Sequence, residues 1–520
     1  MPDPPEPGVN PALLRALRSP AMYPGNPPVA VHETHASVVF VAGESAYKIK
    51  KPVSLGFLDY GTLELRRRAC NEEVRVNAEL APGIYLGVVA ISPARAGFRI
   101  ASEQAPDAVE YAVQMRSFRE RDTLMGMIDA GAVNRGHIAE LARLLAEFHR
   151  RAERVQGWGH EQVIESWLRN VRELALAGPP ARWALDVAAS FGEVFVESRE
   201  GEIRGRADAG LARDGHGDLR CEHILMEPYI RVVDRIEFDP GLRRADVGCD
   251  LAFLAMDLEA NGQGWAAREL VRSYERSGAS AGSQELRSFY AAHRALVSAK
   301  VALISASERT GADGARERER AQRLWSLAER LCWRARAPTA LVACGPAASG
   351  KSTLAGELSR RSGMPVLSSD ELRKRLAHVG PHERAGEEHY GEHFSHETYR
   401  QLALEALHAL RGGPGVIVDA TCRSREDRRL LLDGLSRGRA APLLVRCDVP
   451  LQVALERSAR RLGDPERVSD ATPEIVRAQH ERFEDFGAPE GAGLLTLDTL
   501  LPLDQQVAQV TRAVDRTDRG

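Results

Sequence analysis

A stretch of nine residues in the second half of the chain has the composition and spacing of a phosphate-binding loop. GPAASGKST, residues 345–353, fits G-x-x-x-x-G-K-[ST] between the apolar run TALVAC and the helical run LAGELSRR. In such a loop, backbone amides surround phosphate oxygens, the lysine reaches the β and γ phosphates, and the serine ligates magnesium. The sequence therefore predicts an ATP site with Mg²⁺, formed by Gly345, Pro346, Ala347, Ala348, Ser349, Gly350, Lys351, Ser352 and Thr353.

Charged side chains follow the next two apolar runs of this half. Asp370 and Arg373 come after MPVLSS, and Asp419 ends the run GVIVD. Ligands gather at the carboxyl ends of parallel strands. We therefore expect Asp370 to take a proton from the acceptor hydroxyl, Arg373 to hold the acceptor, and Asp419 to act on magnesium. The alternative for Asp370 is a helix N-cap, formed by it or by Ser369.

Arginines follow the fourth apolar run, in ALERSARRLGDPERVSDA. We expect Arg457 and Arg461 to lie on a lid over the transferred phosphate, with a solvated helix face as the alternative. The order of these motifs resembles the small P-loop kinases of the polynucleotide kinase, gluconate kinase and chloramphenicol phosphotransferase group. This resemblance covers about residues 338–512. It implies transfer of the γ-phosphoryl group of ATP to a hydroxyl.

Histidines gather between the second and third apolar runs. Residues 378–399 hold five of the fifteen histidines, at spacings that include H-x-x-x-H. Such spacing suits a metal site, but a polar surface helix explains it as well. We expect this stretch to form part of the acceptor lobe.

Lysine is rare in this chain, which makes its positions informative. Six of the 70 basic residues are lysine, and three of them stand together in YKIKKP, residues 47–52. On a strand, Lys48 and Lys50 share one face. We expect Lys48, with Lys50 as the second choice, to bind an ATP phosphate and to pair with Glu72 or Glu73 from the helical run RRRACNEEVRVN. A solvated helix face is the alternative for these glutamates.

HGDLRCEH, residues 216–223, precedes the short strand pattern IRVVD. It resembles the catalytic loop H-G-D-x-x-x-x-N of aminoglycoside phosphotransferases and related protein kinase-like folds. The resemblance implies that Asp218 is the base facing the acceptor hydroxyl and that Asp234 binds magnesium. Where the family has asparagine this chain has His223, and imidazole suits softer metals better than magnesium. We expect Asp234 and His223 to hold Mg²⁺. The alternatives are a single metal ion, a preference for Mn²⁺, recruitment of Glu222, or a catalytically weak site.

The secondary-structure pattern changes along the chain and divides it into parts. Short strand patterns with one helical stretch begin near residue 31, and mostly helical periodicity follows from about residue 133. After a Pro-terminated helix, short apolar strands alternate with helices, as in a parallel sheet covered on both faces. We predict an α/β and α+β fold in four parts: a flexible lead over 1–30, a bilobal protein kinase-like domain over 31–310, a linker helix over 311–337, and a P-loop NTPase domain with a parallel α/β sheet over 338–512.

Composition indicates the cellular compartment and the classes of partner to expect. A net charge of -3 and a pI near 6.6 give no global attraction to nucleic acid or to an anionic membrane. The seven cysteines form no C-x-x-C pair, and the sequence contains no secretory leader and no long apolar run. We therefore expect a cytoplasmic protein without a membrane partner.

The whole arrangement resembles a bacterial two-domain family in which an aminoglycoside phosphotransferase-like domain is fused to a P-loop kinase domain. The resemblance implies ATP at both sites. We predict a bifunctional ATP-dependent kinase for small-molecule or nucleotide-like acceptors. Two alternatives stay open: a degenerate kinase-like module that regulates an active P-loop kinase, and a nucleic-acid end kinase. The sequence names neither acceptor nor oligomeric state.

Overall fold

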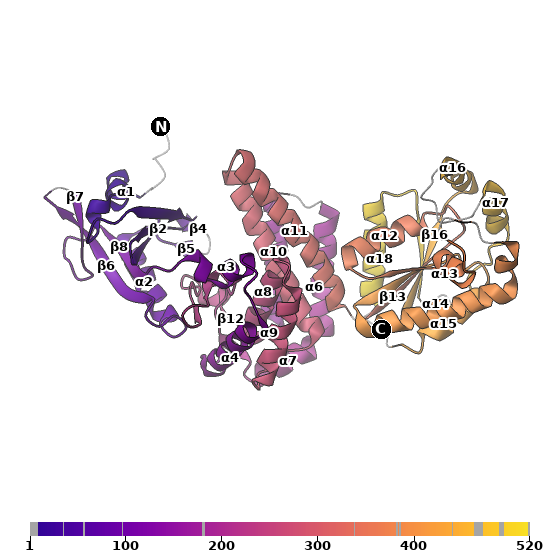
Figure 1. Cartoon of the computed structure of the whole chain (residues 1–520), viewed down its shortest axis with the longest axis horizontal. Helices are drawn as coiled ribbons and strands as arrows, with labels where there is room; N and C mark the ends of the chain where they lie inside the picture. The colour runs from indigo at the N-terminus through magenta and orange to yellow at the C-terminus, as the bar shows by residue number, and fades with distance from the viewer. Residues whose placement is uncertain are drawn as a thin grey trace. The chain divides into compact units, whose positions relative to one another are not determined.

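The structure, a computed structural model, describes residues 9–517 apart from 35, 56–57, 96, 179–181, 337, 381–382, 384–385, 439, 462–471 and 488–492. The chain forms two compact units (Figure 1). Unit 1 comprises Met1–Trp158 and Gly205–Gly282, and unit 2 comprises Gly159–Arg204 and Ser283–Gly520. Among the described residues no helix has the length and apolar character needed to cross a membrane.

Unit 1 begins with a six-stranded antiparallel sheet in the order β1-β2-β3-β8-β6-β7. Side chains of β3 alternate between the two faces of this sheet. Tyr47 and Ile49 join an apolar cluster with Leu13 and Leu17, while Lys48 and Lys50 lie on the other face. Helix α2 covers the lysine face. The elements are α1 (Pro11–Leu17), β1 (Val29–Glu33), β2 (Ser37–Ala42), β3 (Ser45–Lys50), β4 (Ser54–Leu55), β5 (Leu58–Asp59), α2 (Leu63–Asn77), β6 (Tyr85–Ala94), β7 (Gly97–Ser102) and β8 (Glu110–Arg116).

Residues 11–23, which lie in the stretch expected to be a flexible lead, pack against the sheet. Leu13 and Leu17 of α1 are buried against the sheet, and Tyr23 donates its hydroxyl to the Leu17 carbonyl at 2.7 Å. Apolar residues spaced four apart give the short helix one buried face, which covers the side of β3 opposite the lysines.

The rest of unit 1 is mainly helical and carries two short antiparallel strand pairs, β9 with β12 and β10 with β11. Leu141, Leu145, Leu251, Leu254 and Leu270 form its core. The HGD stretch connects β9 to β10, and Asp234 follows β11. These elements are α3 (Leu124–Asp129), α4 (Arg135–Arg151), β9 (Ala212–Asp214), β10 (Ile224–Leu225), β11 (Arg231–Val232), β12 (Arg244–Asp246), α8 (Val247–Ala260) and α9 (Gly264–Arg276), with α7 (Glu200–Asp208) passing from unit 2 into unit 1.

Unit 2 contains a five-stranded parallel sheet in the order β14-β15-β13-β16-β17, with helices on both faces. Side chains of successive residues on the central strand β13 lie on opposite faces of the sheet. Ala340 and Val342 pack with α13, α14 and α15, whereas Leu341 packs with α12 and α18. The elements are β13 (Thr339–Cys344), α12 (Lys351–Ser362), β14 (Val366–Ser368), α13 (Ser369–Leu376), α14 (Glu392–Gly412), β15 (Gly415–Asp419), α15 (Arg425–Leu435), β16 (Pro442–Asp448), α16 (Leu451–Arg461), α17 (Pro473–Glu481), β17 (Leu494–Asp498) and α18 (Leu503–Thr517). The predicted fold class is confirmed.

Four long helices belong to unit 2 together with the parallel sheet. They are α5 (His160–Ala177), α6 (Arg182–Ser198), α10 (Gln284–Glu308) and α11 (Gly311–Ala335). Helix α6 packs against α18, and buried Arg336 after α11 donates to Asp515 of α18 at 2.7 Å. The predicted boundary after residue 310 does not coincide with the compact units, because helical periodicity does not say which helices pack together.

Candidate functional site

Helix α2 presents one of its two adjacent glutamates to the lysines of β3. Glu73 is fully buried and accepts from Lys48 Nζ at 2.8 Å and from Lys50 Nζ at 2.5 Å. Glu72 points away and pairs with Arg75 at 2.6 Å. The sequence left this choice open, and the rotation of α2 against the sheet decides it.

Lys48 also contacts the residue predicted to hold the metal. Its Nζ lies 2.8 Å from Oδ1 of Asp234. Burial tends to lower the pKa of Lys48, but Asp234 and Glu73 raise it well above its usual value. Although burial tends to raise the pKa of Asp234, Lys48 holds that pKa well below its usual range. Both groups therefore stay charged. Asp234 has a φ of 60°, a backbone conformation that residues other than glycine rarely adopt and that concentrates at functional sites.

A buried carboxylate binds the backbone of the loop formed by residues 216–223, called the HGD loop. Asp250 of α8 accepts from the backbone amides of His216 at 2.5 Å and Gly217 at 2.8 Å. His149 of α4 lies 3.3 Å from the same carboxylate. The His216 ring contacts the Val233 carbonyl at 2.9 Å, which joins the loop to the segment that carries Asp234. The loop is thus fixed by groups outside the phosphate site.

The loop brings Asp218 and His223 close to Asp234. Nδ1 of His223 lies 2.8 Å from the Asp218 carbonyl and therefore carries the proton, because a carbonyl only accepts. Nε2 of His223 then carries the lone pair, which accepts from Arg220 at 3.2 Å, and Oδ2 of Asp234 lies 3.9 Å from this nitrogen. Asp218 accepts from Arg220 at 3.0 Å. Burial acts to raise the pKa of Asp218, but Arg220 and His223 hold it below its usual value. Arg220 was missed by the sequence analysis although it stands two residues after Asp218.

Buried His216 predicts a dependence of stability on pH. Burial lowers its pKa from 6.5 to about 4. Below pH 6.5 the unfolded chain binds a proton that the folded chain does not, so stability falls with decreasing pH and levels off near pH 4. Replacing His216 with Asn should remove about 3 kcal/mol from the pH dependence of the free energy of unfolding. Urea unfolding between these pH values measures it. His32→Asn, at an exposed position of β1, is the control, and an unchanged slope in the His216 variant would contradict the assignment.

The phosphate loop follows β13 and leads into α12, as the motif predicts. Gly345 has a φ of 145°, and a Cβ there would come within 2.7 Å of the Cys447 carbonyl. Gly350 has a φ of 98° and forms the N-cap of α12. Both positions need glycine. Lys351 Nζ lies 3.5 Å from the Pro346 carbonyl, so its ammonium folds back over the loop.

Ser352 and Asp419 form the candidate magnesium position. Burial raises the pKa of Asp419, with Lys351 and Ser352 opposing this shift and Asp370 adding to it. Oδ1 of Asp419 is buried without a hydrogen-bond partner among the described residues. A carboxylate oxygen left in this way beside a hydroxyl fits a hydrated Mg²⁺ ion. The N-cap of α13 is Ser368 rather than Ser369 or Asp370, and Asp370 lies in the first turn.

Two of the three predicted arginines, Arg373 and Arg457, have defined partners. Arg373 is buried, donates to the His389 carbonyl at 2.5 Å and lies 5.0 Å from the Tyr390 ring, so it anchors the histidine-rich segment. Arg457 donates to the Thr499 carbonyl at 3.0 Å, and Thr499 donates to the Ser349 carbonyl at 2.7 Å. Arg457 is thereby joined to the phosphate loop. Arg461 ends α16, and its side chain lies outside the described residues.

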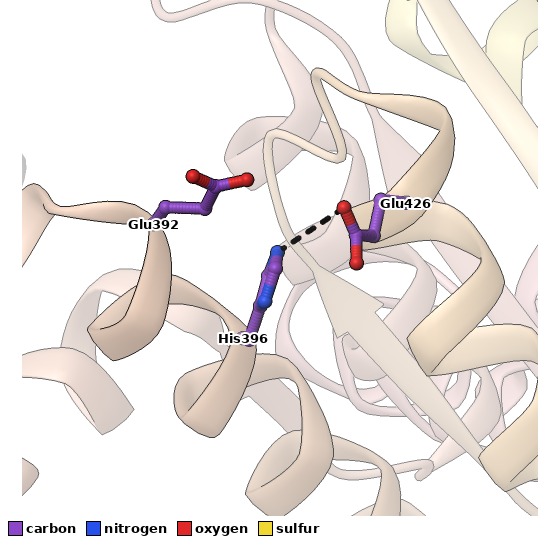
Figure 2. A group of neighbouring side chains, drawn as sticks. All are labelled: Glu392, His396 and Glu426. Carbon is purple, nitrogen blue, oxygen red and sulfur yellow. Dashed lines mark ion pairs between the residues drawn. The ribbon is translucent and has the colours of Figure 1, made fainter.

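The histidine-rich segment contributes one group of possible metal ligands (Figure 2). Glu392 and His396, one turn apart on α14, face Glu426 of α15, with His396 Nε2 3.6 Å from the Glu426 carboxylate. Their ligand atoms lie within 4.8 Å of one another. Both glutamates are exposed in the first turn of a helix, where the helix dipole already stabilises a carboxylate. The group therefore needs no metal to explain it.

Comparisons with known proteins cover both halves of the chain. Residues 341–486 match a family model described as an AAA domain. The uncharacterized protein Rv2004c of Mycobacterium tuberculosis is 31% identical over 506 residues, which span 93% of this chain and 95% of that protein. An adenylate kinase of Brucella ovis is 26% identical over 188 residues, which span 33% of this chain and 96% of the enzyme.

Solved structures resemble parts of the chain. A gluconokinase from Sinorhizobium meliloti is 20% identical, with 35% of this chain and 95% of that chain covered and a TM-score of 0.26. A choline/ethanolamine kinase family protein from Mesorhizobium loti is 14% identical, with 62% and 99% covered and a TM-score of 0.35.

Proposed function

The chain belongs to the same family as Rv2004c of Mycobacterium tuberculosis, and from this premise we propose that it is a bifunctional ATP-dependent phosphotransferase. The match spans nearly the whole of both proteins, so the kinase-like part and the P-loop part belong to one two-part protein. Each part transfers the γ-phosphoryl group of ATP to a hydroxyl of a small-molecule or nucleotide-like acceptor. The observation that carries the proposal is Lys48 Nζ bonded to both Glu73 and Asp234, each at 2.8 Å.

In the first site each residue has a separate role. Lys48 binds an ATP phosphate and Glu73 orients it. Asp234 and His223 would hold a divalent ion, with Nε2 of His223 released by Arg220, and this ion would offset charge on the phosphates. Asp218, kept ionised by Arg220, accepts the proton of the acceptor hydroxyl.

In the second site the loop amides and Lys351 hold the phosphates. Ser352 and Asp419 would hold Mg²⁺, directly and through water, and this ion would offset the charge of the phosphates. Asp370, at the carboxyl end of β14, accepts the proton of the acceptor. Arg457 lies beside the loop through Thr499, and Arg373 shapes the acceptor side through the 387–390 segment. We assign Arg461 to the lid on its position alone.

One observation favours a second candidate function for the first site. Arg220 donates a hydrogen bond to the carboxylate of Asp218 and also lies 3.2 Å from His223 Nε2. An ATP-binding module without transfer, regulating the P-loop site, would tolerate this arrangement. Phosphoryl transfer requires Arg220 to release Asp218 when the acceptor binds.

The test is transfer of label from γ-labelled ATP into a metabolite mixture by the full chain. Point variants are preferable to separated halves, because helices before residue 205 and after residue 282 belong to the same unit as the P-loop. Labelled products that depend on Asp218 and others that depend on Lys351 support two transferase sites. Products that depend on Lys351 alone would favour the regulatory module.

A further inference from the structure

A second buried lysine lies behind Lys48, and the proposed chemistry does not use it. Lys50 is 1% exposed and donates to Glu73 at 2.5 Å and to Glu237. Tyr60 donates its hydroxyl to the same Glu237 oxygen at 2.9 Å, and its ring centre lies 5.4 Å from Lys50 Nζ. Lys50 therefore joins strand β3, helix α2 and the segment after Asp234.

The charges of this cluster are permanent over the neutral pH range. Burial tends to lower the pKa of Lys50, but Glu237 and Glu73 hold it above its usual value. Burial tends to raise the pKa of Glu237, but Lys50 and Lys48 hold it below its usual value. Replacing Lys50 alone would leave the Glu237 carboxylate with the Tyr60 hydroxyl but without its lysine, and proteins tolerate such a buried charge poorly.

The two lysines have different tasks because only Lys48 faces Asp234. Lys48 donates to Glu73 and to Oδ1 of Asp234, which leaves its third N–H for a phosphate and Oδ2 of Asp234 for a metal ion. The bonds of Lys50 to Glu73 and Glu237 involve neither phosphate nor metal. A second contact joins the segment after Asp234 to α2, because the backbone amide of Arg235 donates to the Asn77 side chain at 3.0 Å.

We propose that Lys50, Glu237 and Tyr60 form a positioning cluster that holds the Asp234 segment against α2 and so presents Asp234 to the metal of the bound nucleotide. This inference rests on the function proposed for the first site. The three residues act through Glu73 and Asp234, so they are positioning residues rather than catalytic ones. They keep the ion-binding geometry in place while Lys48 binds the phosphate.

The experiment uses the full chain with Lys351→Met, which leaves ATP turnover to the first site. Glu237→Gln is added because it keeps the shape of the side chain and leaves Lys50 paired with Glu73. We expect the Mg²⁺ concentration for half-maximal ATP turnover to rise about fivefold, with the thermal midpoint near that of the parent. Tyr60→Phe, which removes one hydrogen bond, should shift the same value in the same direction by about twofold. Lys51→Met is the matched control, since Lys51 pairs with Glu33 at the surface.

A folded Glu237→Gln variant with the Mg²⁺ requirement of its parent would overturn the positioning role. If this variant does not fold, Lys50→Met with Glu237→Gln removes both charges and is read in the same way. A parent that neither binds nor turns over ATP would overturn the function proposed for the first site, and the positioning role with it. That outcome is seen before any change to the cluster is made.

Discussion

Replacing Lys351 with Met should lower the rate of ATP-dependent phosphoryl transfer by the P-loop site about 10²- to 10³-fold. The ammonium folds over the loop beside the Pro346 carbonyl, where the β and γ phosphates would lie. A preorganised positive group acts on charge that develops during transfer, so its loss is expected mainly in kcat. Initial rates with γ-labelled ATP, in a chain carrying Asp218→Asn, measure this site alone.

Lys300→Met is the control for this substitution. Lys300 forms a 2.6 Å ion pair with Glu173, away from the phosphate loop, and ion pairs of this kind contribute little. The control should retain the parental rate. A Lys351 variant within threefold of the parent, at saturating ATP, would remove Lys351 from the mechanism.

Replacing Asp218 with Asn should lower phosphoryl transfer by the first site about 10²- to 10⁴-fold, the range for loss of a general base. The amide keeps the shape of the side chain but cannot accept the acceptor proton. ATP affinity should change little, because Lys48 and Asp234 are untouched. The rate is measured in a Lys351→Met chain, and Asp129→Asn, the same change at an exposed position of unit 1, is the control.

The pH dependence of the phosphoryl-transfer rate tests the role of Asp218 in a second way. Because Arg220 and His223 hold its pKa below the usual value against the effect of burial, the base is ionised throughout the neutral and mildly acidic range. In a Lys351→Met chain the rate should therefore show no acid limb from this group above about pH 4. An acid limb in the neutral range would contradict the assignment of Asp218 as the base.

Local motifs accounted for most of the residues brought together in each site. The strand before the predicted phosphate loop and the helix after it could be predicted, because the spacing of the motif and both flanking elements are local in sequence. Strand alternation placed Lys48 and Lys50 on one face. The choice of Glu73 over Glu72 was beyond the sequence, because it depends on how α2 is rotated against the sheet.

Other features depend on long-range contacts that periodicity does not encode. Glu237 joins Lys50 across 187 positions of the chain, and nothing in its neighbourhood marks it. Arg373 was expected to hold the acceptor, but it donates to the backbone of His389, in the short 3-10 helix Glu387–Tyr390 that lies 16 positions further along the chain. The grouping of α5 and α6 with the P-loop sheet arises from packing of α6 on α18.

The central claim is that the chain has two independent sites of phosphoryl transfer. The most direct measurement compares ATP turnover by the wild-type chain, Asp218→Asn, Lys351→Met and the double variant under identical conditions. Independent sites predict that each single variant keeps the turnover of the other site, that the two remainders account for the wild-type rate, and that the double variant is inactive. A single substitution that abolishes all turnover in a folded chain would contradict the claim.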